Sequence, residues 1–315
     1  MTAARLSSDL FNAALFAYIA AMVLSFAYLA FRKRPFHVAA LTVGWIGVSA
    51  NIGSIVARGV AAHRTPWGNM YEFSSLLACL VVLAYLVLVE GRYKVQTVGG
   101  FVFAFAIFTM ALATSFFYVG PTDLLPALNS YWRQIHVTSM IVATSLLATG
   151  CVFTILYLVK VRSERREVSV LRSQDPPPIL GGSVDADAPP DYVPGADEPV
   201  GAATSPAPRR GLPPSATLDR LAYRFIQFGF PIWTFGVMCG AIWAQQTWGR
   251  YWGWDPKETW SFITWVIFAC YLHARATAGW RGTKAAGIAL VGFVSLFVTY
   301  YAVNLWIAGL HTYAK

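Results

Sequence analysis

Long runs of apolar residues, separated by mostly short polar links, dominate the chain. A membrane-spanning helix needs about 20 mostly apolar residues, and eight stretches of the sequence approach that length. The pattern therefore predicts an all-α integral membrane protein with about eight transmembrane helices. The predicted spans are Leu10–Phe31, Val38–Ala57, Phe73–Val89, Val98–Val119, Ile135–Val159, Phe225–Gln245, Trp260–Ala276 and Ala285–Ile307.

The distribution of Lys and Arg predicts how these helices are oriented. The links after the first, third, fifth and seventh spans are rich in basic residues, and the alternate links are poorer. The richer links should face the cytoplasm. Both termini and the link between the sixth and seventh spans would then lie on the outer side.

One long link differs in composition from the rest of the chain. Residues 173–216 are rich in Pro, Gly, Ala and acidic side chains and show no apolar periodicity, which is typical of disorder. They predict a cytoplasmic linker between a five-helix part, residues 1–172, and a three-helix part, residues 217–315. The two parts are expected to form one membrane domain.

The overall composition agrees with a membrane protein. Hydrophobic residues make up 57% of the 315 residues and charged residues 12%, against about 25% charged in average soluble proteins. The net charge of +9 does not indicate nucleic-acid binding, because basic residues of membrane proteins collect in cytoplasmic loops. The four cysteines lie in apolar segments without a C-x-x-C pair, which argues against thiol oxidoreductase chemistry.

The link between the sixth and seventh spans is the most distinctive part of the sequence. Residues 248–260, WGRYWGWDPKETW, contain four Trp, one Tyr and four charged residues. Trp normally packs against something, so this density indicates a platform for a large, flat, apolar ligand with charged groups, which haem fits. The alternative is an aromatic belt at a membrane–water interface.

Two histidines lie on the same outer side as this link. His136 stands at the start of the fifth span, and His311 follows the last span. Imidazole is a common ligand of haem iron, so the two residues are candidates for an axial pair. The alternative is an interfacial role, with each ring satisfied by water or lipid headgroups.

His273 lies inside the seventh span, and an ionisable side chain at membrane depth is a functional candidate. It is also placed to bond a neighbouring helix or to snorkel with Arg275. No second obvious intramembrane His occurs in the chain, so a co-ligand would come from another protein. A further outer motif, residues 66–73, predicts a turn followed by a helix start, with either a capping role for Glu72 or a contact with the Trp-rich link.

Taken together, these motifs resemble a known family. Residues 248–260 are similar to the WWD signature of the haem-handling proteins of cytochrome c biogenesis, as are residues 69–72, 136–137, 261–275 and 309–311. The resemblance is to the CcsA/ResC branch of the system II pathway, called CcsB in actinobacteria. It covers the chain apart from the Pro-rich linker and, at most, the first span.

The resemblance implies a set of haem-binding residues. His136 and His311 would ligate the iron of haem b at the outer face, and His273 would join a histidine of a Ccs1/ResB-type membrane partner. Asp255 and Glu258 would orient neighbouring side chains or cap the seventh helix. The expected contacts of the ring and its propionates are Trp248, Trp252, Trp254, Trp260, Arg250 and Lys257.

The implied function is cytochrome c biogenesis at the bacterial plasma membrane, with the active face outside the cytoplasm. Haem would be delivered to that face and presented for thioether attachment to the C-x-x-C-H motif of apocytochrome c. The chain would be the haem-handling subunit of a cytochrome c synthase, and positioning would carry the catalysis. Thiol-reducing proteins of the pathway would supply reduced acceptor cysteines.

Three other functions are alternatives to cytochrome c synthesis. A haem transporter or chaperone without ligase activity would use the same ligands. An ion or proton transporter predicts more charged residues within the spans than the sequence contains. A quinone-linked electron carrier predicts paired His on neighbouring helices, which the sequence does not show.

Overall fold

The computed structural model describes residues 2–121, 130–174, 211–307 and 309, and these form helices and loops without a strand. Seven helical stretches are long and apolar enough to cross a membrane, which confirms the predicted all-α, multi-pass fold. Two stretches, η1 and η3, are π-helical. The elements are α1 (Ala3–Phe31), α2 (Arg34–Ala61), α3 (Met70–Ala84), η1 (Tyr85–Arg92), α4 (Gly99–Phe116), α5 (Tyr131–Gln174), α6 (Ser215–Trp248), α7 (Pro256–Ala276), α8 (Thr283–Phe297), η3 (Val298–Ala302) and α9 (Val303–Trp306).

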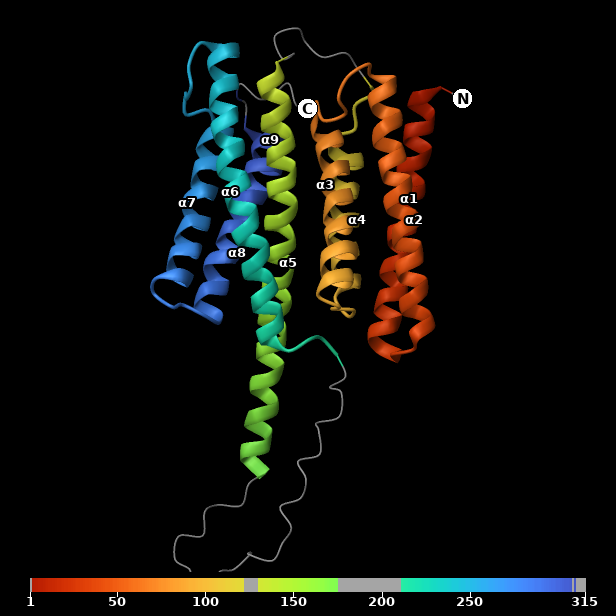
Figure 1. Cartoon of the computed structure of the whole chain (residues 1–315), viewed down its shortest axis with the longest axis vertical. Coiled ribbons are helices and arrows are strands. Elements are labelled where there is room, and N and C mark those ends of the chain that lie inside the picture. Colours follow the sequence, from red (N-terminus) through yellow and green to blue (C-terminus); the bar gives the residue numbers. More distant parts are fainter. Residues whose placement is uncertain (1, 122–129, 175–210, 308, 310–315) are drawn as a thin grey trace, which may run out of the picture.

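The seventh predicted span, α7, is a helix, but it is less apolar than the other predicted spans. It is a helix of 21 residues and packs against α6 and α8 (Figure 1). It is not among the seven apolar stretches, because Trp, Thr, His273 and Arg275 lower its mean hydropathy. The count of eight therefore becomes seven strongly apolar helices together with α7.

Several helices begin before the apolar runs do, because polar residues cap them. The Thr2 hydroxyl accepts a hydrogen bond from the Arg5 backbone N–H at 3.4 Å, at the start of α1. The Asn69 side chain accepts one from the Glu72 N–H at 2.9 Å, at the start of α3. Such caps satisfy N–H groups that have no partner within the helix.

The two ends of the predicted Pro-rich linker are helical. α5 continues to Gln174, well past the end of its apolar run at Val159, and Figure 1 shows it projecting beyond the other helices. α6 begins at Ser215, whose hydroxyl donates to the Glu164 carboxylate of α5 at 2.6 Å. Residues 175–210 lie outside the described part of the chain, so the division into two parts stays a prediction.

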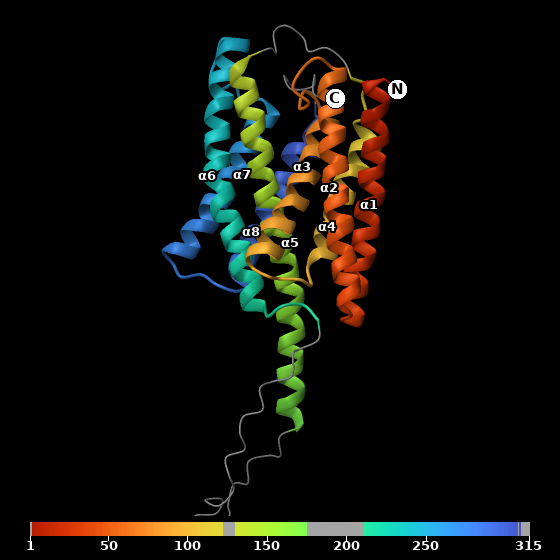
Figure 2. The same cartoon turned by 45° about the vertical axis from the view of Figure 1, so that its right-hand side comes forward.

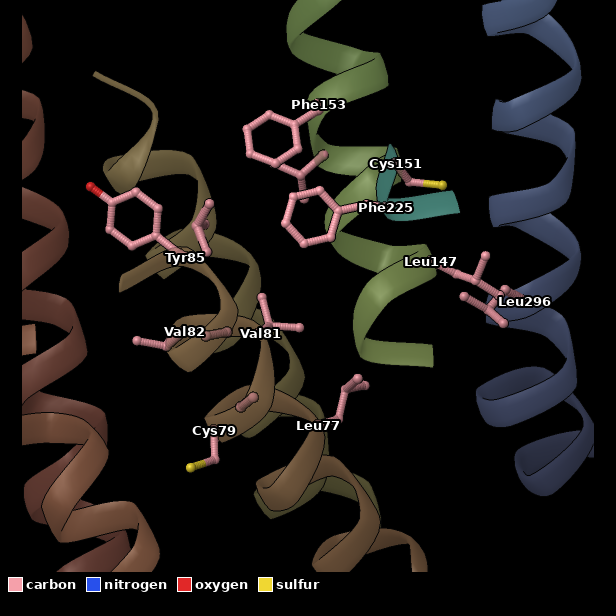
Figure 3. Packing of buried hydrophobic residues seen from close by; sticks show 14 of the residues in the cluster. Leu77, Cys79, Val81, Val82, Tyr85, Leu147, Cys151, Phe153, Phe225 and Leu296 are labelled. Carbon is pink, nitrogen blue, oxygen red and sulfur yellow. The ribbon is translucent and has the colours of Figure 1, made fainter. Parts of the chain in front are cut away.

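The hydrophobic core joins α3, α5, α6 and α8. Figure 3 shows Leu77 and Val81 of α3 on the side of α3 that faces α5, and Leu147 of α5 beside Leu296 of α8. The rings of Phe153 and Phe225 stack at 5.6 Å between α5 and α6. This packing fixes α3, α5 and α6 relative to one another.

The two ends of the bundle carry different loops. The link between α6 and α7 lies at the same end as the starts of α3 and α5 (Figures 1 and 2). The turn between α1 and α2 and the loop after η1 lie at the opposite end. The basic residues in these opposite-end loops, or directly next to them, are Arg32, Lys33, Arg34, Arg92 and Lys94.

Candidate functional site

A pocket opens at the end of the bundle that carries the Trp-rich link, between α3, α5, α6 and α7. Its cavity volume is about 130 Å³, whereas pockets for drug-sized ligands measure about 300–1,000 Å³. A large flat ligand would therefore require the aromatic walls to move apart. Four residues predicted for the site lie in its lining: His136, Trp248, Trp252 and Lys257.

His136 is held by a hydrogen bond between helices. Its Nδ1 lies 2.7 Å from the backbone carbonyl oxygen of Gly236 on α6. A carbonyl oxygen only accepts hydrogen bonds, so Nδ1 carries the proton of this bond. In the neutral ring the lone pair is then on Nε2. This arrangement is typical of metal-ligating histidines, in which a backbone carbonyl fixes the tautomer.

Two glycines of α6 give His136 its position. A Cβ on Gly240 would lie 2.7 Å from His136 Cε1, and a Cβ on Gly236 would lie 2.6 Å from Met140 Sδ. Real Cβ contacts are not that short, so larger residues at these positions would force the His136 and Met140 side chains to shift. The imidazole also stacks on the buried Trp243 ring at 6.1 Å. Small residues thus bring α5 and α6 together where the candidate ligand lies.

The carboxylates of the Trp-rich link cap α7. Asp255 is the N-cap residue and forms a capping box with Glu258. The Glu258 Oε2 accepts from the N–H of Gly253 at 2.7 Å and from the N–H of Asp255 at 3.2 Å. Capping, one of the two roles expected for these carboxylates, is therefore what the structure shows, and it fixes the link to the start of α7.

The four predicted Trp residues divide into two groups. Trp248 and Trp252 line the pocket, and Trp248 packs on Trp243 at 5.2 Å. Trp254 has a left-handed backbone, with φ 57°, and is 66% exposed. Trp260 is half-buried and does not contribute to the lining. Only the first two are therefore placed to touch a ligand in this pocket.

Lys257 differs from Arg250 in its surroundings. Burial lowers the pKa of Lys257 to about 8, against the opposing charge of Asp255. Its ammonium has no hydrogen bond or ion pair with any described residue. Arg250 is exposed, and its guanidinium lies against the backbone of Gly253. Lys257 is therefore the basic group already placed in the pocket wall.

The pocket also contains two indole N–H groups that lack an acceptor. Trp67 and Trp252 both line the pocket, and their Nε1 atoms are buried without a hydrogen-bond partner among the described residues. Buried donors normally have a partner. Together with Lys257, these groups fit a ligand that brings acceptor oxygens, such as carboxylates.

The opposite wall of the pocket is held by Glu72. Its carboxylate is almost fully buried and accepts from Arg58 Nε at 3.0 Å and from Arg64 Nη1 at 2.8 Å. It also accepts from the Gly68 N–H at 2.7 Å. The loop from Trp67 to Asn69, which lines the pocket, is therefore anchored to a buried charge cluster. Residues 66–73 thus form the predicted turn and helix start, with Asn69 as the N-cap residue and Glu72 paired with arginines. The predicted contact with the Trp-rich link stays a prediction, although both segments contribute to the lining.

The other two predicted iron ligands are His311 and His273, and His273 does not line the pocket. His311 lies outside the described residues, although a Cβ on Gly309, two positions earlier, would lie 2.8 Å from Asp255 Oδ1. His273 is exposed on α7, about 24 Å along the helix from Lys257 at 1.5 Å per residue. Its Nδ1 lies 3.4 Å from the Thr277 hydroxyl.

Reasoning from the sequence missed several lining residues that belong to helix interiors. Trp243, Met140 and Tyr300 lie within apolar runs, where a large side chain usually belongs to the core. The one usable signal was the Gly236–Gly240 spacing, which places two small residues on one helix face. Residues of the lining that were not predicted include Trp67, Arg133, Met140, Trp243, Thr299 and Tyr300.

Comparison with known proteins gives a consistent answer. A family model described as cytochrome C assembly protein matches residues 67–311. The cytochrome c biogenesis protein CcsA of Gloeobacter violaceus is 36% identical, over 96% of this chain and 94% of the relative. The protein of the same name from Mesostigma viride is 34% identical, over 80% of this chain and 78% of the relative.

A solved structure shares the fold. The cytochrome c heme lyase CcmF superposes with a TM-score of 0.65 at 16% identity, covering 96% of this chain and 47% of that one. This chain thus spans about half the length of that protein, and the likeness concerns the fold alone. On the sequence matches, the chain belongs to the cytochrome c assembly protein family and is a multi-pass membrane protein of cytochrome c biogenesis.

Proposed function

We propose that the pocket at the Trp-rich end binds haem b as a substrate and presents it for thioether attachment to the C-x-x-C-H motif of apocytochrome c. The observation that carries this proposal is the environment of His136. A histidine with its proton fixed on Nδ1 lies in an aromatic pocket, which suits axial ligation of haem iron through Nε2. His311, two positions after Gly309, is the second axial ligand in this proposal.

The unpartnered donors of the pocket suit the propionates of haem. The Lys257 ammonium would pair with one carboxylate, and the buried indole N–H groups of Trp67 and Trp252 would donate to propionate oxygens. Arg250 would turn from the Gly253 backbone toward the second carboxylate. Trp248 and Trp252 would lie against the ring, while Trp254 and Trp260 shape the link.

We assign the pocket to the outer face of the bacterial plasma membrane. The basic loops lie at the other end of the bundle, and such loops face the cytoplasm in multi-pass proteins. Delivery of haem would start near His273, which lies toward that basic end. Because His273 is exposed on α7, a histidine of a Ccs1/ResB-type partner has access to form the other half of a membrane site.

The chain's own part in thioether formation is positioning. Ligation by His136 and His311 would hold the iron, and the pocket walls would hold the ring so that its vinyl edge meets the incoming thiols. A well-oriented pair of reactants gains a large rate advantage without a covalent enzyme intermediate. Thiol-reducing proteins of the pathway would keep the acceptor cysteines reduced.

Co-expression with a ResB-type partner and an apocytochrome c tests this function. Covalent haem on the cytochrome, detected by haem stain after denaturing electrophoresis, is expected with the wild-type pair and not with His136→Ala. The alternative function is a haem transporter or chaperone without ligase activity. Haem that co-purifies with the wild-type pair, without any covalent product, would favour that alternative.

A further inference from the structure

A second pocket, of about 600 Å³, lies at the opposite end of the bundle. It is formed by the end of α1, the loop after η1, α5 and the segment that leads into α6. Three basic residues, Arg32, Lys94 and Lys160, line it. Lys160 follows His136 by 24 residues on α5, about 36 Å at 1.5 Å per residue, so this pocket is separate from the haem site.

Lys160 forms the buried floor of the basic pocket. It is 9% exposed, and its ammonium makes no hydrogen bond or ion pair with any described residue. Among the described lining residues, the acidic one is Glu164, and its carboxylate already accepts from the N–H and the hydroxyl of Ser215, at 3.3 and 2.6 Å. Among the described residues, Lys160 therefore has no ion-pair partner, and a bound anion would supply one.

Arg32 and Lys94 are exposed cations at the mouth of the pocket. Both have left-handed backbones, with φ 58° and 55°, a conformation that glycine adopts most readily. The Arg32 guanidinium donates to the Gly211 carbonyl and lies 5.7 Å from the Tyr28 ring centroid. The chain thus places long cations, rather than glycine, at two turns that open into one pocket.

We propose that this pocket binds the phosphate of an acidic phospholipid headgroup from the cytoplasmic leaflet. Lys160 follows directly on the apolar run that ends at Val159, so the pocket lies where a helix leaves the bilayer. Acidic lipids of that leaflet attract basic residues near the membrane surface, and basic pockets between helices bind their headgroups. The phosphate would supply the counter-charge of Lys160, with Arg32 and Lys94 beside it. The inference is independent of the proposed haem function.

The test compares lipid-dependent stability of the full-length protein in nanodiscs. Wild type, Lys160→Gln and Lys160→Arg are each reconstituted in phosphatidylcholine alone and in phosphatidylcholine with phosphatidylglycerol. The acidic lipid is expected to raise the Tm of wild type and Lys160→Arg by about 5 °C, and to leave Lys160→Gln unchanged. In phosphatidylcholine alone, Lys160→Gln should melt no lower than wild type, because Lys160 has no ion pair with a described residue to lose.

Two controls complete the experiment: a lysine outside the pocket, and inorganic phosphate in place of the acidic lipid. Lys284 lies at the same end, over the Trp280 ring at 5.9 Å and outside the pocket, so Lys284→Gln should respond to the acidic lipid as wild type does. An equal rise in Tm with the acidic lipid in wild type and Lys160→Gln would contradict the proposed lipid site. Inorganic phosphate that reproduces the full shift in phosphatidylcholine would overturn the lipid assignment and leave a free-anion site.

Discussion

At the scale of single residues, the surroundings of His136 and Lys257 influence where each side chain carries its proton and how readily it loses it. One backbone carbonyl, that of Gly236, fixes the proton of His136 on Nδ1. Burial keeps Lys257 easier to deprotonate than an exposed lysine. Both effects act on groups that the proposed function uses, one on the iron and one on a propionate.

Lys257 predicts a pH dependence of haem binding. Its pKa is lowered by burial to about 8, so the ammonium loses its charge as the pH rises through that value. Only the charged form attracts a propionate, and haem affinity of the wild type should fall by roughly tenfold between pH 7 and pH 9.5. The measurement is a titration of the haem-free protein with haem, followed by absorbance.

Two variants of the same residue serve as controls. Lys257→Met should bind haem more weakly at pH 7 and show no such fall, because it lacks the titrating charge. Lys257→Arg keeps its charge over this pH range, so its haem affinity should stay high and should not change with pH. A fall of the same size in Lys257→Met would show that another group causes the pH dependence.

At the scale of elements, the site depends on how closely helices approach one another. Gly236 and Gly240 let α5 press His136 and Met140 onto α6, while a capping box ties the Trp-rich link to α7. The buried carboxylate of Glu72 holds the facing loop. The pocket therefore depends on three local features: the close approach of α5 and α6, the capping box and the Glu72 carboxylate. Each of them can be tested by a single substitution.

Gly240→Ala should disturb His136 without adding any charge. The new Cβ would lie 2.7 Å from the imidazole, so the ring must shift and its bond to Gly236 weaken. Overpacking of this kind costs about 1–3 kcal/mol, and haem bound after purification should decrease. Gly287→Ala is the matched control, because a Cβ there meets nothing within 4 Å. Equal haem content in the two variants would contradict the packing argument.

Glu72→Gln should destabilise the protein as a whole. The change leaves Arg58 and Arg64 without the carboxylate that they share, and breaking a buried ion pair costs about 3–5 kcal/mol. A lower Tm in detergent is expected, together with weaker haem retention, because the Trp67–Asn69 loop loses its anchor. Glu167→Gln, on the exposed end of α5, should leave the Tm unchanged. An unchanged Tm in Glu72→Gln would count against the proposed anchor.

At the scale of the whole molecule, the fold followed from the sequence more directly than the pocket did. Apolar runs of spanning length located the helices, because the bilayer sets that length. They did not locate helix ends such as Pro256 or Gln174, which depend on caps and on polar helix-forming residues. The histidine and Trp positions pointed to one end of the bundle, but Trp243 and Met140 reach the pocket only through helix packing, which periodicity does not specify.

The aromatic pocket and the basic pocket lie at opposite ends of the helix bundle. Aromatic side chains and His136 gather at one end, and basic residues with Lys160 gather at the other. The proposed function, in which haem is received on one side and presented on the other, would use both ends.

The most direct test of the central claim is an absorption spectrum of the purified protein, with wild type beside His136→Ala and His311→Ala. A reduced, low-spin haem spectrum is expected for wild type, and it should be lost or weakened in both variants. His63→Ala, an exposed histidine outside the pocket lining, should match wild type. Stoichiometric haem that neither His136→Ala nor His311→Ala affects would contradict the account and move attention to His273.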